Sequence, residues 1–163
     1  MSTITSLSLE TRSSLLRPIV LGTKFIFISQ LIHSWIVPTL IQKTSFIVVL
    51  QYMASGALGM AAFEGGIATA LLGVIFHLIF SFVIAGVFIL SASRIPLLRR
   101  YAIAGSLLCG LGVFIVMHMV VTPLSATPPI PAPSIPGLIE DILEHILVVG
   151  LPLGILVQRN ANI

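Results

Sequence analysis

Histidine and carboxylate side chains recur in this chain at positions where they could act together. On a helix, Asp141 and His145 are four residues apart and share one face, as do Glu140 and Glu144. A carboxylate and an imidazole on one face can hold a divalent metal ion if other helices supply further ligands. The same groups can relay protons. We therefore take Asp141, Glu144 and His145 as candidate metal ligands, with a proton relay as the alternative.

Three further ionisable residues are candidates for a role within the membrane: His77, Glu64 and His118. His77 lies near the middle of a long apolar stretch, where an ionisable group is costly. Such a histidine either serves a function or donates a hydrogen bond to a backbone carbonyl group of a neighbouring helix. Glu64 precedes this stretch, and His118 lies near the end of the next one.

A simpler explanation exists for the acidic residues. Carboxylates in the first turns of a helix complement the helix dipole and anchor the helix at the membrane interface, which by itself accounts for Glu140, Asp141 and Glu144. Four methionines are expected on the same side of the membrane as these acidic residues: Met53, Met60, Met117 and Met119. Thioether ligands would admit a softer cation such as copper(I).

The composition indicates that these residues are carried by a membrane protein. The chain has 163 residues, of which 57% are hydrophobic and 8% are charged, and its mean hydropathy is +1.16. A soluble domain carries about a quarter charged residues, so this surface fits lipid and not water. The lipid bilayer is thus the expected partner. Nucleic acid is excluded, because the eight Lys and Arg residues are scattered and form no basic stripe.

The fold class expected is all-α, an integral membrane bundle of about four transmembrane helices. A helix needs about 20 residues to cross the hydrocarbon core. The expected spans are residues 16–40, 66–91, 101–121 and 137–157. Residues 44–59 are apolar but short, and they predict an interfacial or re-entrant helix, with a fifth span as the alternative. The remaining segments are an N-terminal tail (1–15), a proline-rich outer loop (122–136) and a C-terminal tail (159–163).

Basic residues predict the orientation. With four spans and the N-terminus inside, the cytoplasmic side holds Arg12, Arg17, Arg94, Arg99, Arg100 and Arg159, and the opposite side holds Lys43. This bias follows the positive-inside rule. We expect a multi-pass protein of the bacterial inner (plasma) membrane with both termini in the cytoplasm.

Stripes of small residues predict close contacts between helices: Gly66-x-x-x-Ala70, Ser106-x-x-x-Gly110 and Gly150-x-x-x-Gly154. Small side chains let helix backbones approach in lipid. The contacts would lie either within one bundle or between copies, so a homo-oligomer and a larger membrane complex both remain open.

No catalytic signature is present. The chain lacks a Gly-rich phosphate loop, His-Glu-x-x-His, Gly-x-Ser-x-Gly and Cys-x-x-Cys, so no catalytic residue, cofactor or cofactor-binding residue is assigned, and an enzyme is not favoured. We interpret the chain as a small accessory or structural subunit of a membrane assembly. The alternative is a small oligomeric transporter or channel component for protons or metal cations.

One region carries a resemblance. The stretch Ala62-Phe63-Glu64-Gly65-Gly66, followed by Ala70-Leu71-Leu72-Gly73 and His77, resembles a family of small uncharacterised bacterial four-helix inner-membrane proteins. The similarity continues through Met117, Pro123-Leu124-Ser125, His145 and Gly150-Leu151-Pro152, over roughly residues 45–155. The resemblance implies a four-helix inner-membrane protein and no particular activity.

Overall fold

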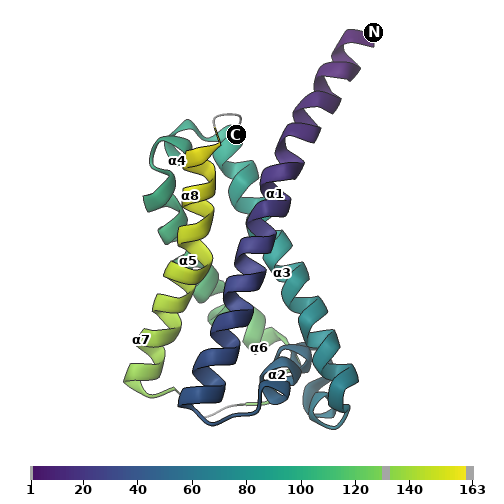
Figure 1. The fold of residues 1–163 in the computed structure, drawn as a ribbon, viewed down its shortest axis with the longest axis vertical. Helices are drawn as coiled ribbons and strands as arrows, with labels where there is room; N and C mark the ends of the chain where they lie inside the picture. The colour runs from purple at the N-terminus through teal and green to yellow at the C-terminus, as the bar shows by residue number, and fades with distance from the viewer. Residues whose placement is uncertain (1, 130–132, 161–163) are drawn as a thin grey trace.

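The computed structural model describes residues 2–129 and 133–160, and every regular element in this part of the chain is helical. The long helices lie lengthwise in the molecule and alternate in direction (Figure 1). The long elements are α1 (Ser2–Ile36) with the π-helical η1 (Val37–Ile41), α3 (Gly66–Arg94), α5 (Ala102–Val116) with the π-helical η3 (Met117–Val121) and α6 (Thr122–Leu124), and α7 (Ile135–Glu144) with the π-helical η4 (His145–Gly150) and α8 (Leu151–Arg159). The short ones are α2 (Phe46–Leu58), the 3-10 helix η2 (Gly59–Phe63) and α4 (Pro96–Arg100).

The two ends of the bundle differ in what they hold. In Figure 1, α1 begins and α8 ends at the upper end, where α4 also lies. At the lower end, α1 finishes in η1, α2 follows, and α3 begins. We use "upper end" and "lower end" in this sense.

Helix length and hydropathy make this a multi-pass membrane protein. Among the described residues, four stretches are long and apolar enough to cross a membrane: Leu15–Ile41, Phe46–Phe63, Gly66–Arg94 and Ala102–Leu124. Three of them coincide with the predicted spans 16–40, 66–91 and 101–121, so these helices are confirmed as candidates.

The remaining candidate differs from the sequence prediction. Phe46–Phe63 is the segment that we expected to be interfacial or re-entrant. The predicted span 137–157 is not among the candidates, although α7, η4 and α8 follow one another without a break from Ile135 to Arg159. Three carboxylates lie in the second and third turns of this helix and make its lower part polar: Glu140, Asp141 and Glu144.

Several predicted boundaries shift. Helix α1 begins at Ser2, so most of the predicted tail 1–15 is helical. The proline-rich loop is shorter than expected, because α6 includes Pro123 and because Ser134 caps α7 through its side-chain oxygen, which accepts from the backbone N–H of Gly137. Residues 130–132 of that loop and 161–163 of the predicted C-terminal tail lie outside the described residues.

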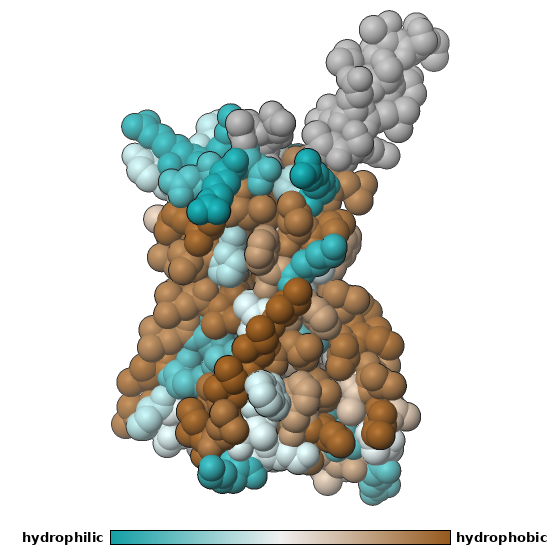
Figure 2. All heavy atoms as spheres, in the orientation of Figure 1, coloured by the Kyte–Doolittle hydropathy of each residue, from teal (hydrophilic) through white to brown (hydrophobic). Residues whose placement is uncertain are grey.

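The surface has the pattern that a bilayer requires. In Figure 2 hydrophobic side chains cover most of the visible face between hydrophilic groups at the upper and lower ends. A hydrophilic strip interrupts them between α1 and α7 in the lower half. Because isolated polar groups are costly in lipid, this strip calls for a physical explanation.

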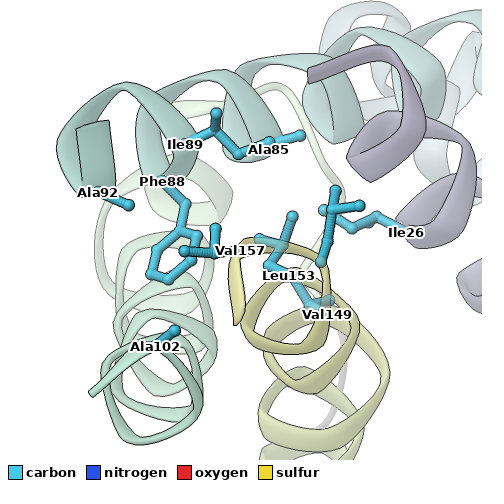
Figure 3. Close-up of a cluster of buried hydrophobic side chains, with 10 residues drawn as sticks. Ile26, Ala85, Phe88, Ile89, Ala92, Ala102, Val149, Leu153 and Val157 are labelled. Carbon is cyan, nitrogen blue, oxygen red and sulfur yellow. The ribbon is translucent and has the colours of Figure 1, made fainter. Parts of the chain in front are cut away.

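The apolar core lies where α8 packs between α1, α3 and α5 (Figure 3). Its fully buried side chains include Ile26, Ile89 and Leu153. Val149, also buried, belongs to η4 and lies four residues after His145. The core therefore begins one helical turn above the ionisable groups of α7.

A seam of small residues brings α5 against η4 and α8. A Cβ atom at Gly150 would collide with the carbonyl group of Ser106, and one at Gly110 would collide with the carbonyl group of His145. Gly154 likewise faces the Ser106 side chain. The stripes 106–110 and 150–154 thus serve contacts inside one chain. In the third stripe, Gly66 has open space where its Cβ would be, and Gly73 takes the close contact with the Leu50 carbonyl of α2 instead.

Candidate functional site

Six ionisable side chains from three separate stretches of helix meet in the lower half of the bundle. We call them the polar cluster: His33, His118, Glu140, Asp141, Glu144 and His145. His33 comes from α1, His118 from η3, and the other four from α7 and the start of η4. Each of the six lies within hydrogen-bond distance of at least one other member.

His33 connects α1 to α7. Its Nε2 atom lies 2.7 Å from Glu140 Oε1, and its Nδ1 atom lies 3.0 Å from Glu144 Oε1. Glu140 and Glu144 share one face of α7 at a spacing of four, as the sequence predicts, and this face is turned toward α1. Both contacts pair a ring nitrogen with a carboxylate oxygen, and these are the atom types that bind divalent cations such as Zn²⁺.

Asp141 connects η3 to η4. Its Oδ2 atom lies 3.0 Å from His118 Nε2, and its Oδ1 atom lies 3.1 Å from His145 Nδ1. His118 Nδ1 faces the carbonyl oxygen of Phe114 at 3.1 Å. The Phe114 ring packs on both imidazoles, with centroid distances of 4.4 Å to His118 and 5.6 Å to His145. This aromatic contact shields one side of the pair.

The register of α1 against η4 places His33 opposite the carboxylates. The Ser29 hydroxyl lies 3.2 Å from the carbonyl oxygen of Val148. Ser29 is one turn before His33, and Val148 is one turn after Glu144, on helices that run in opposite directions. A contact between Ser29 and Val148 therefore brings His33 and Glu144 to the same level.

The contacts of His118 with Asp141 and His145 depend on the seam of small residues between α5 and η4. Gly110 lets α5 approach the backbone of His145. Phe114 lies one turn after Gly110, and His118 lies one turn after Phe114. The close approach at Gly110 thus sets how near His118 comes to Asp141 and His145.

Two of the three histidines lie in π-helical segments, His118 in η3 and His145 at the start of η4. A π-helical turn changes the direction of the side chains that follow it, and such turns are frequent at functional sites. Hydropathy patterns do not reveal a π-helical turn, so sequence analysis could not foresee the ring orientations.

The cluster lies deeper than the loop level. His33 precedes the end of η1 at Ile41 by eight residues, and Glu144 follows the start of α7 at Ile135 by nine. At a rise of about 1.5 Å per residue, His33 and Glu144 lie roughly 12 and 14 Å from these helix ends. Glu144 and His145 side chains are only 13% and 12% exposed. Ionisable side chains with so little exposed surface are unusual in a membrane protein.

Two overlapping groups in the cluster have ligand atoms close enough to hold a metal ion. His33, Glu140 and Glu144 form one group, and Asp141, Glu144 and His145 form the other. In each group the ligand atoms lie within 4.8 Å of one another. Imidazole nitrogen and carboxylate oxygen suit divalent first-row cations such as Zn²⁺. Met60 and Met119 are largely exposed, at 65% and 72%, which speaks against a softer thioether site.

The structure brings some of the candidates chosen from the sequence together and leaves others apart. It brings Asp141, Glu144, His145 and His118 together, and it adds two partners that sequence analysis did not select, His33 and Glu140. For Glu140 the sequence signal was its spacing of four from Glu144, whereas the partnership of His33 with these carboxylates depends on the packing of α1 against α7.

Glu64 and His77 stand apart from the cluster. The Glu64 side chain is exposed and forms no ion pair with the described residues. His77 packs against the Phe27 ring at a centroid distance of 5.4 Å, and its buried Nε2 atom has no hydrogen-bond partner among the described residues. A functional role for either one remains a prediction.

Comparison with known proteins assigns neither a family nor a fold. No protein-family model matches the chain, and no curated protein and no solved structure matches it. The resemblance drawn from residues 45–155 thus remains a prediction. What the chain does has to be argued from the polar cluster and its place in the bundle.

Proposed function

We propose that this chain is a small multi-pass membrane protein that binds a divalent first-row transition-metal cation at the polar cluster, as a cation-handling component of the membrane. The observation that carries the proposal is the convergence of His33, His118 and four residues of α7 and η4 from three stretches of helix.

The simpler explanation accounts for less of this arrangement. Helix α7 has no acidic residue in its first turn, where the helix dipole acts, so favourable interaction with the dipole does not account for Glu140, Asp141 and Glu144. Nor does it explain why His33 of α1 directs both of its ring nitrogens at Glu140 and Glu144. Three carboxylates also place up to three negative charges in a half-buried position, and such charges need a cationic partner in surroundings of low dielectric constant.

The arrangement of the helices supports four crossings: α1, α3, α5 with α6, and α7 with α8. Helix α2 lies at the lower end beside the start of α3, where Gln51 donates to the Gly66 carbonyl at 3.0 Å. The other part of α2 is tied to the loop after α6, because the Ala126 N–H donates to the Gly56 carbonyl at 2.9 Å. Both contacts are with lower-end segments, which supports an interfacial α2.

This topology also supports the predicted orientation. Helices α1, α3, α4 and α8 contribute arginines to the upper end, and Lys43 follows η1 at the lower end. By the positive-inside rule the upper end faces the cytoplasm. The polar cluster then lies in the outer half of a bacterial inner membrane.

The proposal is tested by metal binding to the intact protein purified in mild detergent. After metal removal and dialysis against Zn²⁺, the wild-type protein is expected to retain Zn²⁺ by elemental analysis. The variant His33→Ala with Asp141→Asn is expected to lose it while keeping its helical circular dichroism and its elution volume. Glu64→Gln is the matched control, because Glu64 lies outside the cluster.

A different result would favour the accessory-subunit interpretation. A protein that binds no Zn²⁺, Mn²⁺ or Co²⁺ and co-purifies in fixed ratio with larger membrane subunits would overturn the metal proposal. The carboxylates would then serve as interface anchors.

A further inference from the structure

We infer that the polar cluster holds two divalent cations side by side, with the Glu144 carboxylate shared between them. This inference rests on the proposed function and adds to it the number of cations and the residue that joins them.

The two groups of ligand atoms share one residue. His33 and Glu140 appear only in the first group, Asp141 and His145 appear only in the second, and Glu144 appears in both. A carboxylate has two oxygen atoms and can bind one cation with each, as in two-metal sites whose ions lie about 3.5–4 Å apart. Among the residues that the structure describes, Glu144 is therefore the one placed to bridge two cations.

The geometry of α7 separates the two positions. Glu140 and Glu144 share a face that looks toward α1, where His33 supplies an imidazole. Asp141 and His145 share the adjacent face, one residue further around the helix, which looks toward η3. Residues one position apart diverge by about 100° around a helix. One cation cannot sit centrally on both faces, whereas two cations on either side of Glu144 can.

Charge is compatible with a second cation. With neutral imidazoles, Glu140, Asp141 and Glu144 carry three negative charges, so one divalent cation leaves a net charge of −1 and two leave a net charge of +1. The second cation therefore leaves no larger uncompensated charge than the first in these half-buried surroundings. Each position offers three protein ligands, which leaves room for water at each cation.

His118 fits this arrangement as a positioning residue. It binds Asp141 through Oδ2, whereas His145 lies beside Oδ1. Hydrogen bonds of this kind orient a ligating carboxylate and hold it in the geometry that the cation needs. His118 itself belongs to neither group of ligand atoms.

Stoichiometry of the full-length protein tests the inference. Elemental analysis and calorimetric titration with Zn²⁺ are expected to give two cations per chain for the wild type and for the control Glu64→Gln. His33→Ala is expected to keep one cation, and so is His145→Ala. Glu144→Ala is expected to lose both. Retained elution volume and helical content would show that each variant is folded.

A second readout can be made on the wild-type protein. With Mn²⁺ loaded to saturation, electron paramagnetic resonance is expected to show the broadened spectrum of an interacting pair. At substoichiometric Mn²⁺, or in His33→Ala, the six-line spectrum of an isolated ion is expected. Two Mn²⁺ ions that share one carboxylate lie about 3.5–4 Å apart, which is close enough for their spins to interact.

The possible failures are distinguishable. A wild type that binds no cation overturns both this inference and the proposed function. One cation per chain, or two cations with isolated Mn²⁺ spectra, overturns the shared carboxylate and leaves the proposed function in place. A folded Glu144→Ala variant that keeps one cation would likewise overturn the shared carboxylate and leave the proposed function in place.

Discussion

The Ser29 hydroxyl lies 3.2 Å from the Val148 carbonyl oxygen, although 119 residues separate them in the sequence. The same hydroxyl donates within α1 to the Phe25 carbonyl at 2.6 Å, so the contact across the helices reflects close packing more than a strong hydrogen bond. It matters because it holds α1 and η4 in the register that places His33 beside Glu144.

Enlarging the side chain at this contact should separate the two halves of the site. Ser29→Leu pushes α1 away from η4, and Zn²⁺ affinity is expected to fall by about tenfold or more, as for other changes that move a ligand without removing it. Calorimetric titration measures the effect. Ile28→Leu, on the exposed side of α1, is the control and should bind like the wild type. Unchanged affinity in Ser29→Leu would show that the register of α1 does not control the site.

A methyl group at Gly110 should disturb the packing of α5 against η4, which positions His118 beside Asp141 and His145. Its Cβ would collide with the His145 carbonyl group, so Gly110→Ala is expected to lower the free energy of unfolding by about 1–3 kcal/mol. The control Gly112→Ala has open space at its Cβ and should be neutral or slightly stabilising. Unfolding in detergent by increasing denaturant compares them. Equal stabilities of the two variants would contradict the close packing of α5 against η4 at Gly110.

Cation binding should weaken as the pH falls. Protons compete with a cation for imidazole nitrogens and carboxylate oxygens, because the ligands must be deprotonated to coordinate. The Zn²⁺ affinity is therefore expected to fall as the pH falls, by about tenfold per pH unit for each proton displaced. Titrations between about pH 5.5 and 7.5 measure it. An affinity that does not change with pH would exclude histidine as a ligand.

Labelling of single cysteines should locate α2. In a Cys109→Ala background, which removes the one native cysteine, Lys43→Cys and Glu64→Cys flank α2 on either side. If α2 is interfacial, a membrane-impermeant maleimide labels both from outside the cytoplasm. Leu97→Cys, in α4 at the upper end, should react only from the cytoplasmic side. Lys43→Cys and Glu64→Cys that react from opposite sides would show that α2 crosses.

Hydropathy alone was enough to predict a multi-pass helical membrane protein, although Phe46–Phe63 and not 137–157 is the fourth candidate span. A long apolar run such as 66–91 crosses a bilayer as a helix because a helix satisfies every backbone polar group within the segment. Alternation of such helices puts Asp141, Glu144, His145 and His118 at one end of the bundle, and the structure has them together there. That much of the site follows from spacing and the number of crossings.

Contacts between distant parts of the chain decided the rest. The partnership of His33 with Glu140 and Glu144 depends on the register of α1, and the orientation of His118 and His145 depends on π-helical turns and on the close approach at Gly110. Helical periodicity states which residues share a face, but it carries no information about which face of another helix lies opposite. The sequence therefore determined the residues and their end of the bundle, whereas only side-chain packing between the helices determined which ring nitrogen meets which carboxylate.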